Sequence, residues 1–284
     1  MFMRKEVNYT NNLFLAVKLL VNNSKLFIPD IIFGITALVL GFLFIYFNGL
    51  LVALYDQSQL ESLIRSFMSH TPTLIRLGIS FLVILIISLL LGLGTACVRY
   101  SMVRAAVMKE KVSFWKAAKE GKNYFWRIFG IRIILSLITF IPILILALIF
   151  IGLASLFEGS SLIIVSVLLV MFGFALVMAY LFYINSLFVF TYPTLFMKTK
   201  SGVFKTLRES YSYFCANKKK AFITYLILFV VNLAFGIFGV GITNISPTSF
   251  GTVFIVAAVI FYLLKTLIGI AIKLWGDLFV FENY

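Results

Sequence analysis

Long apolar runs alternate along the chain with shorter segments rich in lysine, arginine and aromatic residues. A bilayer core is about 30 Å thick and takes about 20 apolar residues of α-helix, so uncharged runs of 18 or more residues count as candidate spans. Six runs are long enough, with few or no charges: Leu26–Phe47, Leu77–Val98, Ile133–Phe157, Gly159–Met197, Ala221–Gly241 and Gly251–Trp275. The period-2 alternation of a membrane β-barrel is absent from the sequence. The pattern therefore predicts an all-α polytopic transmembrane bundle with six spans.

Composition agrees with a membrane protein. Of the 284 residues, 62% are hydrophobic and 12% are charged, against about 45–50% and about 25% in a soluble globular chain. This balance excludes a soluble globular protein, and we expect residues 1–284 to form a single integral membrane domain. The first span is expected to be retained, because no short apolar core with an A-x-A-type cleavage site precedes it.

The distribution of lysine and arginine predicts the orientation. Nineteen of the 24 basic residues fall in three segments: 1–26, 99–127 and 187–221. The alternate loops carry only Arg65 and Arg76. Because positively charged loops stay in the cytoplasm, we expect a multi-pass protein of the cell membrane with cytoplasmic N- and C-termini.

The net charge of +14 matches the anionic lipid of the inner leaflet, which attracts each nearby lysine or arginine by about 1 kcal/mol. The charges are spread over three segments beside the membrane and form no nucleic-acid recognition motif. We therefore expect anionic membrane lipids as partners, a protein at the cytoplasmic face as a further candidate partner, and no nucleic acid. The oligomeric state is not predicted.

An internal repeat organises the basic segments. The stretch Met108–Phe125 recurs 89 positions later, without a gap, as Met197–Phe214. The segment Thr10–Lys25 is a weaker third copy, at an offset of 101. Leu187-Phe-Val-Phe190 likewise recurs as Leu278-Phe-Val-Phe281. The chain is thus predicted to contain three pseudo-repeats, each an in-plane amphipathic helix followed by a transmembrane hairpin: residues 10–108, 109–197 and 198–284.

The repeated helices, here named the bracket helices, combine aromatic and basic residues. In the second copy Ser113 is a candidate N-cap, and an apolar stripe of Phe114, Ala118, Gly121 and Phe125 is predicted opposite the lysines. In the third copy the predicted apolar stripe is Phe204, Leu207, Tyr211 and Phe214. Such helices lie in the headgroup plane. They either ease the chain into the bilayer or form a cytoplasmic surface for lipids or a partner, whose candidate residues are Trp115, Lys116, Lys119, Lys122, Phe204, Lys205 and Arg208.

The stretch Phe114-Trp-Lys-Ala-Ala-Lys-Glu-Gly121 leads into a span, and its pattern is repeated along a six-span chain. This pattern resembles the membrane domain that is fused to some glycerophosphodiester phosphodiesterases and that occurs alone in many bacterial and archaeal proteins. The resemblance covers nearly the whole chain and implies a membrane module with no chemistry of its own. The phosphodiesterase barrel that gives the fused relatives their activity is missing here, so the resemblance implies no activity for this chain.

Catalytic chemistry is poorly represented in the sequence. The single histidine, His70, is predicted to lie in an outer loop, and no H-E-x-x-H, G-x-S-x-G, phosphate-binding glycine loop or metal-spaced cluster occurs. Cys97 and Cys215 map to the cytoplasmic side, where thiols stay reduced. We therefore predict no catalytic residue, no cofactor and no metal site.

Among the charged residues within or at the ends of the predicted spans, three are candidates for an intramembrane charge cluster: Asp30, Arg132 and Lys265. Asp30 and Arg132 fall near the inner ends of the first and third spans, at almost the same depth in neighbouring repeats, which makes them a candidate ion pair. The alternative for both is snorkelling to the headgroups. Lys265 lies about ten residues, or ~15 Å, from the inner end of the sixth span. It is the best single candidate for a functional residue, with a buried partner or a water-filled cavity.

Two functional hypotheses follow. The first is a non-enzymatic membrane module that organises lipids or partner proteins through the basic bracket helices. The second is a transporter or permease subunit whose in-plane helices couple to a soluble ATPase. The small number of polar residues at the membrane midplane favours the first hypothesis.

Overall fold

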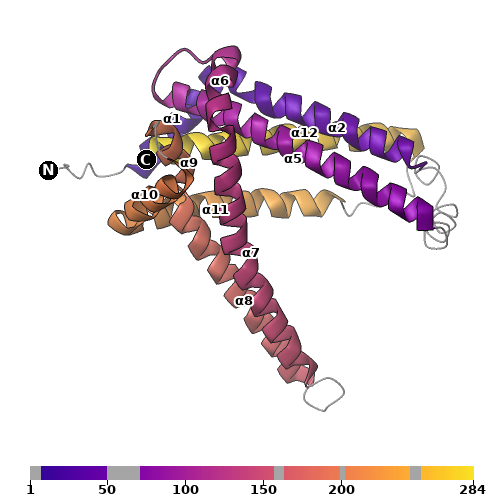
Figure 1. Cartoon of the computed structure of the whole chain (residues 1–284). Coiled ribbons are helices and arrows are strands. Elements are labelled where there is room, and N and C mark those ends of the chain that lie inside the picture. The colour runs from indigo at the N-terminus through magenta and orange to yellow at the C-terminus, as the bar shows by residue number, and fades with distance from the viewer. Residues whose placement is uncertain (1–7, 50–70, 157–162, 199–201, 244–250) are drawn as a thin grey trace. The chain divides into compact units, whose positions relative to one another are not determined.

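A computed structural model describes residues 8–49, 71–156, 163–198, 202–243 and 251–284. All regular elements of these residues are helices (Figure 1), which confirms the predicted all-α class. Within the described ranges, five helical segments are long and apolar enough to cross a membrane: Ser24–Phe47, Leu74–Val107, Phe114–Ser155, Ile164–Met197 and Lys218–Ile237. They correspond to the first five predicted spans. The sixth predicted span lies in α12 (Gly251–Glu282), and its membrane crossing stays a prediction.

The chain divides into two compact units. The smaller unit consists of Ser24–Met102 and Val112–Phe125, and the larger unit of Met1–Asn23, Val103–Lys111 and Trp126–Tyr284.

The smaller unit contains a helical hairpin and a short crossing helix. Its elements are η1 (Ser24–Phe27), α2 (Ile28–Phe47), the greater part of α5 (Thr71–Val107), α6 (Phe114–Gly121) and η2 (Lys122–Tyr124). Helices α2 and α5 run side by side (Figure 1), with the ring of Phe44 edge-on to that of Phe81. Near the end of α2, the amide of Asn48 donates a hydrogen bond to the hydroxyl of Ser80 at 3.0 Å.

Helix α6 approaches α5 closely through a glycine. A Cβ atom placed on Gly121 would lie only 3.0 Å from the carbonyl carbon and oxygen of Cys97. Gly121 is buried, as are Cys97 and Ala117, one turn earlier on α6. The absence of a side chain at position 121 therefore allows the two helix backbones to meet.

The larger unit contains the remaining helices: α1 (Tyr9–Asn22), α7 (Phe125–Ser155), α8 (Ile163–Phe188), α9 (Thr191–Met197), α10 (Val203–Ala216), α11 (Lys218–Thr243) and α12. Helices α7 and α8 form a long hairpin (Figure 1), in which the hydroxyl of Tyr180 donates a hydrogen bond to the carbonyl of Ile138. Farther along the hairpin, the ring of Phe150 lies edge-on to that of Phe172.

Aromatic side chains join α8 to α11. Phe182 of α8 lies edge-on to three rings of α11, with centroids 5.0 Å from Phe222 and Tyr225 and 5.6 Å from Phe229. Such edge-to-face pairs add about 0.5–1.5 kcal/mol each beyond the burial of their surface. This cluster holds the start of α11 against the second half of α8.

A short helix, α9, follows α8 within the run Gly159–Met197, which the sequence analysis treated as the fourth span. Helix α8 ends at Phe188, and α9 begins two residues before Pro193, a position in the first turn where proline costs no hydrogen bond. Five residues of α9 are buried: Thr191, Pro193, Thr194, Leu195 and Phe196. The chain after the fourth span is thus a part of the protein interior.

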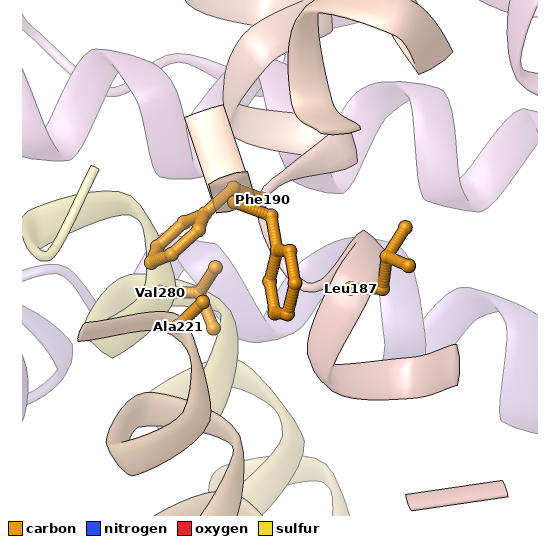
Figure 2. Packing of buried hydrophobic residues seen from close by; sticks show 5 residues of the cluster. Leu187, Phe190, Ala221 and Val280 are labelled. Atoms are coloured by element: carbon orange, nitrogen blue, oxygen red, sulfur yellow. The ribbon is translucent and has the colours of Figure 1, made fainter. Parts of the chain in front are cut away.

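The core of the larger unit includes both copies of the repeated Leu-Phe-Val-Phe motif. Its buried residues are Leu187, Phe190, Phe214, Ala221 and Val280. Figure 2 shows the ring of Phe190 beside the side chains of Ala221 and Val280. Leu187 and Phe190 come from the first copy of the motif and Val280 from the second. The repeated motif therefore packs against itself where α8 ends and α12 approaches its own end.

Candidate functional site

The three bracket helices are present as α1, α6 and α10. Each one leads within a few residues into a long apolar helix: α1 through η1 into α2, α6 through η2 into α7, and α10 through Asn217 into α11. At the start of α1, the side chain of Asn8 accepts a hydrogen bond from the backbone N–H of Asn11 at 3.0 Å, which satisfies one free donor of the helix end. Ser113 occupies the N-cap of α6 as predicted, without a side-chain capping bond.

One face of each bracket helix is buried and lined by small residues. Ala16, Ala117 and Thr206, which are equivalent under the repeat offsets of 101 and 89, are all buried. One turn later, Gly121 and Ser210 are equivalent and are buried as well. Small side chains allow helices to approach closely. Each bracket helix thus buries a small residue at the equivalent position, which in α10 is joined by the buried Leu207 and Phe214.

The opposite face carries an exposed aromatic ring. Phe14, Trp115 and Phe204 occupy equivalent positions and are 71%, 81% and 78% exposed. Four residues after each ring stands an exposed cation, and residues at i and i+4 share one helix face. We name these the aromatic–cation pairs: Phe14 with Lys18, Trp115 with Lys119, and Phe204 with Arg208.

All seven predicted surface residues are exposed: Trp115, Lys116, Lys119, Lys122, Phe204, Lys205 and Arg208. The ammonium of Lys116 lies 3.9 Å from the carboxylate of Glu120 on the same helix, a long contact between exposed groups that contributes little. A surface that contacts lipids or a partner must be exposed, and these residues meet that condition.

The predicted apolar stripe is wrong for α10 and agrees with the burial of α6. In α10, Leu207 and Phe214 are buried, whereas Phe204 and Tyr211 are exposed, so the predicted stripe is divided between two faces. In α6 the predicted stripe is buried or partly buried throughout, and the exposed ring of Trp115, which was not part of it, shares a separate face with the lysines. The physical reason is that α10 buries Thr206 and Ser210 together with Leu207 and Phe214. This burial turns Phe204 and Tyr211 outward.

Asp30 forms a buried ion pair with a partner that the sequence analysis did not identify. Its Oδ1 atom accepts a hydrogen bond from Nη1 of Arg99 at 3.0 Å, within the smaller unit. Both residues are 4% exposed. Arg99 directly follows the predicted second span, and an antiparallel hairpin brings that end beside the start of the first span.

The other two predicted intramembrane charges lie in the larger unit. Arg132 of α7 is partly buried, and its predicted pairing with Asp30 stays a prediction, while the ion pair that the structure assigns to Asp30 is the one with Arg99. Lys265 of α12 is also partly buried. Its functional role stays a prediction.

Within the larger unit, Tyr213 joins α10 to Lys220 at the start of α11 and to Tyr284 after the end of α12. The hydroxyl of Tyr213 donates a hydrogen bond to the backbone oxygen of Tyr284 at 2.8 Å and accepts one from the ammonium of Lys220 at 3.1 Å. The centroid of the Tyr213 ring lies 4.8 Å from that of Tyr284 and 5.0 Å from that of Phe190. Burial raises the pKa of Tyr213 to about 12, so the phenol stays protonated and holds both hydrogen bonds.

In the described part of the chain, no group of three or more histidine, cysteine, aspartate or glutamate side chains could hold a metal ion. Cys97 is buried and Cys215 is exposed, and both are free thiols. His70 lies outside the described residues.

No protein-family model, curated protein or solved structure matches this chain. The resemblance to the membrane domain fused to glycerophosphodiester phosphodiesterases therefore stays a prediction. The class of protein follows from the fold: the length and composition of its helices indicate a multi-pass α-helical membrane protein.

Proposed function

We propose that this chain is a non-enzymatic module of the cell membrane with six spans, which organises lipids or partner proteins through three cytoplasmic bracket helices. The observation that carries the proposal is the common arrangement of α1, α6 and α10: a buried small-residue face and, opposite it, an exposed aromatic–cation pair. A surface repeated three times beside the spans is suited to hold something at the membrane, and it lacks the grouped nucleophiles and acids of an active site.

Support for the three pseudo-repeats comes from burial at equivalent positions. Phe14, Trp115 and Phe204 are exposed at one position of the repeat, and Ala16 and its two equivalents are buried two residues later. The Leu-Phe-Val-Phe motifs of the second and third repeats share one core. Residues that share a role in packing are expected to be equivalent in an internal repeat.

Support for six spans comes from the two ends of the described chain. Helix α1 packs along α12, as Figure 1 indicates, and the amide of Asn12 donates a hydrogen bond to the side-chain oxygen of Asn283 at 2.9 Å. This contact favours a topology in which the residues before the first span and after the last span lie on one side of the membrane. Such a topology has an even number of crossings, with α12 as the sixth. The surplus of basic residues in the segments on that side argues for cytoplasmic termini.

A transporter or permease subunit coupled to a soluble ATPase is the second candidate, and Lys265 is the observation that favours it. A charge deep in a span is costly and often marks a substrate or ion pathway. The first candidate is preferred because Asp30, another charge within a predicted span, is paired with Arg99. This pairing gives the charge of Asp30 a structural role rather than one in a substrate pathway.

Labelling with a membrane-impermeant maleimide tests the orientation. Cys215 is exposed on α10, so it is expected to react in inside-out vesicles but not in intact cells. In a Cys215→Ser background, Leu156→Cys at the end of α7, where Leu156 is 75% exposed, is expected to react in intact cells. Reaction of Cys215 from outside intact cells would contradict both the topology and the cytoplasmic bracket helices.

Extraction of the protein into native nanodiscs tests the function itself. The proposed module is expected to carry anionic phospholipid, or one protein in fixed stoichiometry, well above their abundance in the surrounding membrane. Lipid and protein mass spectrometry of the purified discs measures both. Co-purification of an ATPase would support the transporter instead. Discs with the composition of the bulk membrane and no associated protein would refute the organising role.

A further inference from the structure

We propose that the exposed face of the bracket helices is occupied by the anionic bilayer itself. Each aromatic ring enters the boundary between headgroups and acyl chains, and the cation four residues later binds a lipid phosphate. This inference rests on the proposed function and selects the membrane, rather than a protein, as the partner. The residues concerned are Phe14, Lys18, Trp115, Lys119, Phe204 and Arg208.

The chemistry of the exposed face favours a lipid surface. On α6, Trp115 shares its face with Lys119 and Lys122, all exposed. The cores of protein interfaces are depleted of lysine, whereas tryptophan and lysine together are typical of the headgroup region of a membrane. The carboxylate of α6, Glu120, lies off this face beside Lys116. The face thus combines a ring with cations that match phosphate.

The chain also restrains these helices to the membrane surface. Between α6 and the apolar helix α7 stand only the three residues of η2, which reach at most about 11 Å even when fully extended. Between α10 and α11 stands Asn217 alone. The headgroup layer is about 5–8 Å deep on each side of the core. A bracket helix therefore stays within reach of this layer, and its outer face meets lipid before any soluble partner.

The three pairs differ in a way that fits one occupant. The ring is phenylalanine, tryptophan or phenylalanine, and the cation is lysine, lysine or arginine. A protein partner would need to match three different side-chain shapes at three sites. A fluid bilayer accepts any large ring at its boundary and any cation at its phosphates. The three pairs share the kind of side chain, an aromatic ring and a cation, but not its exact shape. A lipid surface requires no more than this.

Depth-dependent fluorescence quenching tests the ring. The full-length protein carries Trp126→Phe and Trp275→Phe, so that Trp115 is the remaining reporter among the three tryptophans. It is placed in nanodiscs of phosphatidylcholine and phosphatidylglycerol, with bromine on the upper part of the acyl chains. We expect strong quenching and a blue-shifted emission. Unquenched, red-shifted emission would overturn the proposal and leave the face to a soluble partner, which the proposed function still allows.

Charge reversal tests the cations in otherwise native protein. The test variant reverses the charge of the cation in all three aromatic–cation pairs, through Lys18→Glu, Lys119→Glu and Arg208→Glu. The matched control reverses three other exposed cations of the same side, Lys111, Lys116 and Lys205. Each reversed cation is expected to lower the enrichment of phosphatidylglycerol over phosphatidylcholine about fivefold. Mass spectrometry of the discs measures this enrichment.

The control variant makes the outcome specific. It changes the net charge by the same amount, so a diffuse electrostatic attraction predicts equal losses in both variants. A clearly larger loss in the pair variant supports the proposal. Equal losses, or none, overturn it. The proposed function fails separately, through outside labelling of Cys215, and that result would leave the quenching of Trp115 unaffected.

Discussion

Replacing either Asp30 or Arg99 by a neutral residue is expected to destabilise the smaller unit by about 3–5 kcal/mol, because each change leaves the charge of the other residue buried without its counter-charge. The two side chains lie 3.0 Å apart and both are 4% exposed. Asp30→Asn and Arg99→Gln preserve the approximate shapes. At about 2–4 °C per kcal/mol, either change should lower the Tm of the detergent-solubilised protein by about 6–20 °C, measured by loss of the monodisperse species on heating.

The double variant is expected to lose less than the sum of the two single losses, because removal of both charges leaves neither one buried alone. The matched control is the exposed pair of Lys116 and Glu120, 3.9 Å apart on α6, for which the same cycle should be additive. Strictly additive losses for Asp30 and Arg99 would show that the contact contributes nothing specific to the hairpin of α2 and α5.

The ion pair also shows why part of the site could not be predicted from the sequence. The apolar run that predicted the second span ends at Val98, because Arg99 interrupts it. In the structure α5 continues to Val107, with Met102 and Val103 fully buried. Hydropathy measures transfer into lipid, so it ends a span at the first charge. It does not detect a helix that continues into the protein interior with its charge neutralised.

The bracket helices illustrate a second limit. Their positions were predictable, because aromatic and basic residues recur at fixed offsets. Their faces were only partly predictable, because periodicity separates apolar from polar positions without saying what each face contacts. The small residues Ala16, Ala117 and Thr206 belong to no apolar stripe, yet they are the buried ones. Alignment of the three copies would have indicated them, since a small side chain recurs where the neighbouring residues vary.

Pro193 is the sequence feature that indicates helix α9. Pro193 follows Thr191-Tyr192 directly after a long apolar helix, and proline is favoured in the first turn of a new helix. The uncharged run continues through this point to Met197, so hydropathy alone treats the new helix as the remainder of the span. Conformational preference, and not hydrophobicity, separates the two elements here.

Enlarging Gly121 is expected to release α6 from α5. A Cβ atom at this position would already lie 3.0 Å from the backbone carbonyl of Cys97, and a helix backbone moves aside only by disturbing its own hydrogen bonds. Gly121→Leu is therefore expected to cost about 1–3 kcal/mol as an overpacked contact. Because α6 covers Cys97, the release should also expose this buried thiol.

The reactivity of Cys97 measures that release directly. In a Cys215→Ser background, Cys97 is the remaining thiol of the chain. Its rate of reaction with maleimide in detergent is expected to rise about 5- to 150-fold in Gly121→Leu, since each 1.4 kcal/mol of the cost of about 1–3 kcal/mol changes the opening equilibrium tenfold. The matched control is Gly94→Leu, three residues from Cys97 on α5, where an added Cβ meets nothing within 4 Å. This control should leave the thiol protected. Equal protection in Gly121→Leu and Gly94→Leu would mean that α6 does not depend on the glycine for its place against α5.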